Sequence, residues 1–253
     1  MTALRIALVA LAVGGALPAQ GGGNAGSMAH LPDDAALPIV FTRTVSAAHA
    51  RPGDPVQART TQAVRLSDGR EVPSGSLVKG HVLASKPFQY DKTPYATQVA
   101  GTLEIQIDSL DAQGQAVPLH VALRALADPF ASQAAWEAKS TDLDSLGTTT
   151  QVGGDLLVPS QSEIRNQNGD VIGYNKKGGQ FAHLLAAGGG AVTCKPGNTE
   201  QPVSRFSASA CGLYGFGDIS LTSYTDSQIG LSSTHVSPAI DKHSTALLES
   251  LQD

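Results

Sequence analysis

The chain has 253 residues and a formal net charge of −5, with 15% charged residues, 27 glycines and few aromatic side chains. Its charges are spread along the sequence, so it lacks the clustered basic face of a nucleic-acid-binding protein, and no nucleic acid is expected as a partner. The length suits one or two domains, whose cores must be built from Val, Leu, Ile and Ala.

The N-terminal segment, residues 1–19, has the layout of a cleavable signal peptide. Arg5 precedes an unbroken apolar run over residues 6–13, and small residues follow at Ala16 and Ala19. This run is much shorter than the roughly 20 apolar residues that span a bilayer, and a buried N-terminal helix is the alternative. No Cys near the cleavage region could carry a lipid anchor. The predicted location is therefore the periplasm, the cell envelope or the extracellular space, with no membrane span in the mature chain.

Residues 20–38 are rich in glycine and other small residues and contain two prolines, which predicts a flexible linker with order beginning near Ile39. Residues 39–127 then alternate apolar and polar side chains, as half-buried strands do. The clearest pair is a β-hairpin whose second strand carries Val117, Leu119, Val121, Leu123 and Ala125 on its apolar face, and Pro118, His120, Ala122 and Arg124 on its polar face.

The next segment, residues 128–162, interrupts this alternation with many Ser, Thr, Asp and Gly residues. We expect a loop-rich excursion with a short helix around residues 131–139. Trp136, the single tryptophan of the chain, lies in it and is expected to pack the excursion down rather than to mark a contact surface.

Residues 163–253 again indicate short strands. Asn168-Gly169 between two apolar segments predicts a tight type I′ hairpin, and residues 244–251 fit a strand better than a helix. The predicted fold is mostly β: an antiparallel barrel-like or sandwich lobe over 39–127, followed by a smaller β lobe over 163–253.

The two cysteines, Cys194 and Cys211, form an even set in a chain predicted to be exported, which favours a disulfide. Two cysteines without nearby histidine pairs make a poor zinc site. In the chain-entropy model, closing a loop of this size stabilises the fold by roughly 3 kcal/mol.

Motifs that would carry catalysis, a cofactor or a metal do not emerge. Residues 73–77 lack the second glycine of a serine nucleophile elbow and fit a tight turn that enters a strand. His81 and His120 fall on polar strand faces, although a fold could bring them together. The aspartate pairs Asp108/Asp111 and Asp142/Asp144 lie in turn or loop sequence, and the glycine runs at residues 177–179 and 188–190 lack nucleotide-binding spacing. We therefore predict no catalytic residue and no cofactor or metal.

One segment resembles a known family. Its turns and strands are marked, in order, by Pro52-Gly53-Asp54, Asp68-Gly69, Pro73, Gly75-Ser76 and Gly80, where Gly80 would let a neighbouring backbone approach closely. This layout resembles the β-barrel region of the TrbI-like proteins of conjugation and type IV secretion. It looks more like a set of uncharacterised bacterial exported proteins, which share an element similar to residues 209–215. The resemblance implies a barrel in the cell envelope and brings no catalytic residues. The membrane-spanning helix and proline-rich region of TrbI-like proteins have no counterpart here.

The function predicted from these features is an exported, non-enzymatic cell-envelope or secreted β module that acts through protein or surface contacts. Other envelope proteins are the expected partners. Two alternatives stay open. One is a secreted hydrolase or carbohydrate-acting enzyme with its site between the lobes, and the other is a ligand-binding barrel with an apolar cavity.

Overall fold

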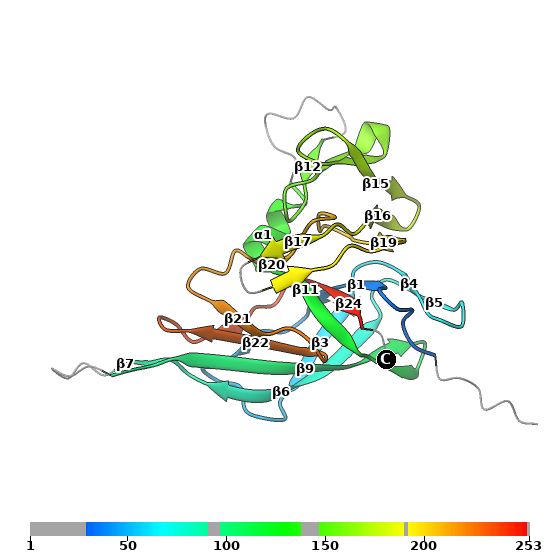
Figure 1. Cartoon of the computed structure of the whole chain (residues 1–253). Helices are drawn as coiled ribbons and strands as arrows, with labels where there is room; N and C mark the ends of the chain where they lie inside the picture. Colours follow the sequence, from blue (N-terminus) through cyan, green and yellow to red (C-terminus); the bar gives the residue numbers. More distant parts are fainter. Residues whose placement is uncertain (1–28, 91–96, 138–146, 190–191, 252–253) are drawn as a thin grey trace, which may run out of the picture.

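The computed structural model describes residues 29–90, 97–137, 147–189 and 192–251, and strands dominate it (Figure 1). The mostly-β prediction is confirmed. The predicted signal peptide, residues 1–19, lies outside the described residues. Two short helices are described, α1 (Pro129–Ala134) and the 3-10 helix η1 (Pro159–Gln161). No helix in the described parts of the chain is long and apolar enough to cross a membrane.

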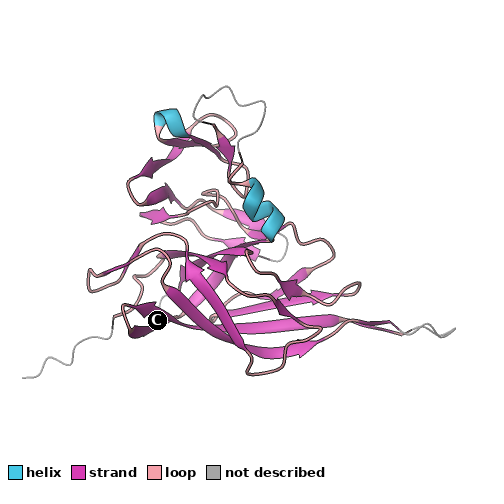
Figure 2. Cartoon of the chain, turned by 180° about the vertical axis from the view of Figure 1, so that it is seen from behind, coloured by secondary structure: helices cyan, strands magenta, loops and turns pink. Residues whose placement is uncertain are grey.

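A barrel-shaped sheet forms the lower layer in Figures 1 and 2. Within the described residues it has ten strands, which follow one another across the sheet as β20 (Gly212–Tyr214), β11 (Val121–Ala127), β24 (Thr245–Ser250), β1 (Ala36–Phe41), β3 (Pro55–Thr60), β6 (Leu77–Lys86), β9 (Gly101–Ala112), β22 (Gln228–Ser233) and β21 (Ser220–Ser223), with β10 (Gln115–Pro118) beside β9. The turn between β21 and β22 nearly closes the sheet onto β11, because Leu123 N donates to Tyr224 O at 2.7 Å. Ser227 N likewise donates to Val121 O at 2.7 Å.

Alternating apolar residues fill the barrel. Along β9, Leu103, Ile105 and Ile107 are buried inside, as their spacing predicts. Further interior side chains come from β1, β3, β6, β11, β22 and β24, so the barrel interior is a packed core. Ala29 and Leu31, which precede β1, are also buried in this core.

A β-bulge in β11 redirects its side chains. The pairing of β11 with β24 shifts register between Leu123 and Ala125, so Leu126 points into the barrel and Ala125 points out of it. The prediction that Ala125 shares a face with Leu123 is therefore wrong. Arg124, predicted on a solvated face, is buried, because the upper layer covers the outside of the barrel here.

The upper layer is a six-stranded sheet in the described part of the chain. Its order is β12 (Thr149–Thr150), β13 (Leu156–Val158), β14 (Glu163–Arg165), β15 (Val171–Lys176), β16 (Gly179–His183) and β19 (Glu200–Pro202). A parallel bridge between Val152 and Phe206 joins the chain that follows its first strand to the chain that follows its last. A second core, which includes Ala125 and Leu247 of the barrel and Ile164 and Phe206 of the upper layer, holds the two layers together.

Four two-stranded ribbons complete the described structure: β2 (Val45–Ser46) with β23 (Ala239–Ile240), β4 (Val64–Arg65) with β5 (Glu71–Val72), β7 (Gln89–Tyr90) with β8 (Gln98–Val99), and β17 (Ala187–Gly189) with β18 (Val192–Cys194). The β7–β8 ribbon projects from the barrel at the left of Figure 1.

The predicted segment boundaries differ from the observed strand pairing in three places. Residues 212–250 return to the barrel sheet instead of completing a second lobe over 163–253, since β22 pairs with β9 and β24 pairs with β1. Residues 128–162, predicted to be loop-rich with one short helix, also supply the strands β12 and β13 of the upper layer. The described part of the predicted linker, 29–38, already contains buried side chains and the start of β1. Apolar alternation marks a strand, but it does not specify which sheet the strand joins.

Local predictions fared better. The short helix is present as α1, and the C-terminal segment is the strand β24. The hairpin at Asn168-Gly169 is formed by β14 and β15, but Gly169 alone of this pair has a positive φ, at 88°, and Gly169 N donates to Asn166 O. A type I′ turn needs positive φ at both positions, so the predicted turn type is wrong. The predicted hairpin after β9 is shorter than expected, because β10 pairs with β9 whereas β11 pairs with β24 and β20.

Candidate binding groove

A buried arginine joins the barrel to the upper layer. The Arg124 side chain has no solvent exposure and forms an ion pair with Glu249 at 3.2 Å. Its guanidinium also donates to the backbone oxygens of Lys195 at 2.7 Å and Ala208 at 3.2 Å, and to Leu185 O. Burial lowers the pKa of Arg124, and the neighbouring Glu249 opposes that shift. Burial raises the pKa of Glu249, again against the effect of its partner. The charged guanidinium of Arg124 therefore holds the backbone of the upper layer against β11.

Glutamine side chains make further bonds between the layers. Gln62, two residues after the end of β3, accepts from Gln180 N at 3.2 Å and from Ser204 N at 3.1 Å through Oε1. Its Nε2 donates to Gln180 O at 3.1 Å. On β19, Gln201 Oε1 accepts from Ala36 N at 3.0 Å, a backbone donor on β1. The relative position of the two layers is therefore set by hydrogen bonds as well as by apolar packing.

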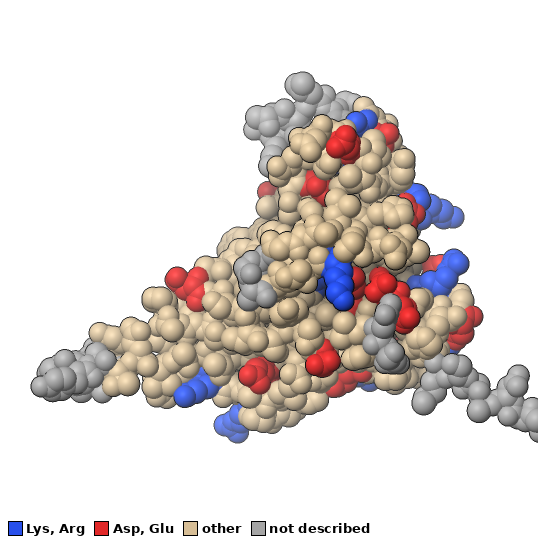
Figure 3. All heavy atoms as spheres, viewed as in Figure 1, with Lys and Arg blue, Asp and Glu red and all other residues tan. Residues whose placement is uncertain are grey.

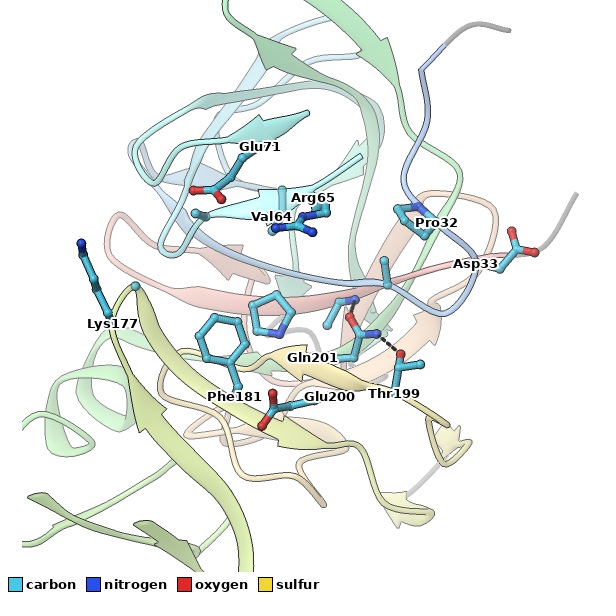
Figure 4. A pocket seen from close by; sticks show the side chains of 15 residues that line it. Pro32, Asp33, Val64, Arg65, Glu71, Lys177, Phe181, Thr199, Glu200 and Gln201 are labelled. Atoms are coloured by element: carbon cyan, nitrogen blue, oxygen red, sulfur yellow. Dashed lines mark hydrogen bonds between the residues drawn. The ribbon is translucent and has the colours of Figure 1, made fainter. Parts of the chain in front are cut away.

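An open groove of about 630 Å³ lies along this junction, and we call it the interlayer groove (Figure 4). Its barrel side includes Pro32, Asp33, Ala36, Val64, Arg65 and Glu71, and its upper side includes Lys177, Phe181, Thr199, Glu200, Gln201 and Pro202. In Figure 4, Lys177 lies at one end and Pro32 and Asp33 lie at the other, with Arg65 and Phe181 between them. A volume of this size falls in the range of about 300–1,000 Å³ that is typical of ligand sites.

Charges of both signs face the groove. Arg65 and Glu71 are exposed on the β4–β5 ribbon, and Lys177 is exposed on the turn between β15 and β16. Among the described residues, these three side chains form no ion pair within 4.0 Å. Figure 3 shows charged side chains of both signs where the two layers meet. A ligand can bind these unpaired charges without first breaking a salt bridge within the protein.

The upper wall of the groove also carries apolar surface. Phe181 and Pro202 are half-buried neighbours on paired strands, in register across β16 and β19. Lys176 is positioned beside them, since its Nζ lies 5.9 Å from the Phe181 ring centroid and 2.5 Å from Glu200 Oε2. The groove therefore combines an apolar wall with unpaired charges of both signs.

The predicted disulfide is present. Cys194 and Cys211 are bonded, and their Cα atoms lie 6.0 Å apart. Both are buried beside β17 and β20. Lys195 follows Cys194 directly, and its backbone oxygen is one that Arg124 binds, so the disulfide and the arginine brace the same part of the upper layer.

The histidines considered in the sequence do not meet. His81 Nδ1 lies 2.8 Å from Asp108 Oδ2, and His120 Nε2 lies 3.6 Å from Asp226 Oδ1. Both pairs are exposed on the outside of the barrel. Within the described residues, no three His, Cys, Asp or Glu side chains are grouped as metal ligands.

The remaining sequence candidates have structural roles. In the 73–77 segment, Ser76 Oγ donates to Pro73 O at 2.7 Å, which confirms the turn. Asp111 Oδ1 accepts from Gly114 N at 2.6 Å in the β9–β10 turn. The pair Asp142/Asp144 lies outside the described residues. Gly178 lies in the β15–β16 turn and Gly179 begins β16, while 188 and 189 lie in β17.

The groove residues themselves were not predicted from the sequence. Arg65 and Lys177 are ordinary solvated residues of strand ends and turns when read in sequence, and they are 112 positions apart. One residue in the sequence signals the contact between the layers. Arg124 is a charged residue in an otherwise apolar strand, and such a residue can mark a place that another layer covers.

Comparison with known proteins found no match among protein-family models, curated proteins or solved structures.

Proposed function

We propose that this chain is an exported, non-enzymatic module of the cell envelope or the secreted fraction, which binds a protein partner through the interlayer groove. The ligand is an extended segment of that partner. It places an apolar side chain over Phe181 and Pro202, an acidic side chain near Arg65 or Lys177, and a basic one near Glu71. The observation that carries the proposal is the pairing of an apolar wall with unpaired charges in one open groove.

Several features favour binding over turnover. Arg124, Gln62 and Gln201 hold the two layers that form the groove against each other, so its walls are held in place before a ligand arrives. Mixed charge around an apolar patch is the arrangement that gives orientation and specificity in protein contacts. The barrel interior is filled by its own side chains, so we place no ligand there.

The exported setting is part of the proposal. It is supported by the signal-peptide layout of residues 1–19 and by the buried disulfide, since disulfides persist in oxidising compartments. The resemblance to the TrbI-like barrel region supports an envelope location. A role in DNA transfer does not follow from that resemblance.

A selection of random displayed peptides on the purified protein tests whether the groove binds extended segments. Selected peptides should combine an apolar residue with an acidic one and should bind the Arg65→Glu/Lys177→Glu variant about tenfold more weakly or worse. The matched control is Lys79→Glu/Lys86→Glu, which changes the net charge equally on β6 and should bind like the wild type.

Equal weakening in both variants would show a general charge effect and would contradict the proposal. So would a selection that enriches no peptide. Specific turnover by the purified protein in a broad hydrolase screen would contradict the non-enzymatic part.

A further inference from the structure

A second groove lies next to the single tryptophan. It has a volume of about 400 Å³ and is lined by Val40, Thr61, Pro129, Gln133, Trp136 and His243, together with Ser132 and Thr245; we call it the tryptophan groove. Its walls are α1 and the adjacent ends of β1 and β24, at the place where Figure 2 shows the longer helix against the junction of the layers. No residue of this groove lines the interlayer groove.

The side chain of Trp136 is exposed, and one face of its ring is held by a cation. The Arg205 guanidinium carbon lies 3.3 Å from the centroid of the indole ring and covers one of its faces. The residue nevertheless remains 59% exposed, so the opposite face is open. Burial lowers the pKa of Arg205 to about 10, and the side chain stays charged at neutral pH. A cation stacked on one face holds the ring in a fixed orientation.

The other lining groups can form hydrogen bonds. Thr61 Oγ1 is buried and has no hydrogen-bond partner in the described structure. The His243 side chain is exposed, on a residue held at a φ of +74°. Ser132 and Thr245 hydroxyls lie 2.8 Å apart at the helix, and each oxygen keeps acceptor capacity.

The charge of the lining limits the kind of ligand. None of the described residues that line the tryptophan groove is Asp, Glu, Lys or Arg, and the charged Arg205 lies against the Trp136 ring without lining the groove, so the lining favours a neutral ligand. A ligand that suits an open indole face and several neutral hydrogen-bonding groups carries C–H groups on one side and hydroxyls around its edge. The negative face of an aromatic ring attracts such weakly positive C–H groups.

We propose that the tryptophan groove binds a neutral saccharide, with one pyranose ring stacked on the open face of Trp136. The ring hydroxyls bond to His243 and Gln133, and a rotation about χ1 gives Thr61 Oγ1 the partner it lacks. This site is independent of the interlayer groove and of the protein partner proposed for it.

Because Trp136 is the only tryptophan, its fluorescence reports directly on this site. We would titrate the full chain with cellotetraose, chitotetraose and maltotetraose. At least one should change the emission in a saturable way, with a dissociation constant of about 1 mM or below.

Variants measured by titration calorimetry then locate the binding. Trp136→Ala should weaken it about tenfold or more, Trp136→Phe should weaken it less, and His243→Ala should weaken it severalfold. The matched control is Phe130→Ala, which removes an aromatic residue that is 82% exposed on α1, the helix just before Trp136, but does not line the groove. Thermal midpoints confirm that each variant is folded.

The proposal is overturned if none of the three tetrasaccharides gives a saturable change up to about 10 mM, well above the expected constant. It is also overturned if Phe130→Ala weakens binding as much as Trp136→Ala does, since stacking on Trp136 would then not be the source of affinity.

Discussion

Arg124 shows how a single residue decides the relation between the two layers. A guanidinium offers five donors, and here four contacts are filled by one carboxylate and three backbone oxygens from separate loops. Nε is buried without a partner, so the network is not fully satisfied. Removing the side chain would leave the Lys195 and Leu185 carbonyls and a partly buried carboxylate without this donor, whereas Ala208 O keeps its bond from Leu185 N.

We therefore expect Arg124→Met to lower the free energy of unfolding by about 3–5 kcal/mol, the range for breaking a buried ion pair. Urea denaturation measures this. The control is Arg165→Met, which breaks the partly exposed pair with Glu163 and should cost about 0–1 kcal/mol. A loss at Arg124 no larger than that of the control would show that the layers are held by apolar packing alone.

Asp155 gives a pH-dependent prediction. The carboxylate is buried, accepts from Ala208 N at 2.9 Å, and has no cation partner within 4.0 Å among the described residues. Burial raises its pKa above the ordinary value of 3.8. The folded state then binds this proton more readily than the unfolded chain does. The stability that Asp155 contributes by binding this proton is complete below pH 3.8, the pKa of the unfolded chain. It is lost as the pH rises through the raised pKa of the folded state.

Asp155→Asn carries no charge at any pH, so it isolates this effect. The thermal midpoint of the wild type should rise relative to that of Asp155→Asn as the pH falls from about 7 to about 4. Asp68→Asn is the control of opposite sign, because hydrogen bonds from Arg70 lower the pKa of the exposed Asp68. A wild-type midpoint that falls relative to Asp155→Asn on acidification would contradict the assignment.

At the scale of elements, the sequence predicts strands well and their bends poorly. Val56, Ala58 and Thr60 are buried at every second position of β3, as the period requires. The bulge at Arg124 interrupts this period of two. An inserted residue cannot be recognised in the sequence, because only pairing with a neighbouring strand defines the register. The sequence predicts the position of the turn at Asn168-Gly169 but not its type. A three-residue loop also places a glycine at positive φ, so the Asn-Gly pair does not distinguish it from a type I′ turn.

Gly80 is an element-scale feature that the sequence did predict. A Cβ at this position would lie 2.1 Å from Gln106 O on the paired strand β9, so only glycine allows the two backbones to approach this closely.

Gly80→Ala should therefore destabilise the fold by about 1–3 kcal/mol, the usual cost of overpacking a filled site. Chemical denaturation measures it against Gly217→Ala, where a Cβ meets nothing within 4 Å. If the two substitutions cost the same, β6 and β9 do not pack as closely as described.

At the scale of the whole molecule, the path of the chain between the two layers is the feature that the sequence predicts least. The chain leaves the barrel after β11, builds the upper layer, and returns to the barrel sheet for β20, β21, β22 and β24. The interlayer groove exists only because of this path, since it brings Arg65 and Val64 opposite Phe181 and Pro202. Local patterns carry no information about such distant neighbours, so the disulfide could be predicted from composition but the groove could not.

The central claim is that a protein partner occupies the interlayer groove. Site-specific photo-crosslinking in the native cells tests it most directly, with a photoreactive residue replacing Thr199 on the groove wall or Lys79 on β6, which lies away from the upper layer in Figure 1. The account predicts one discrete protein adduct from position 199 that disappears with Arg65→Glu, and no such adduct from position 79. An adduct that persists with Arg65→Glu, or equal labelling from both positions, would contradict it.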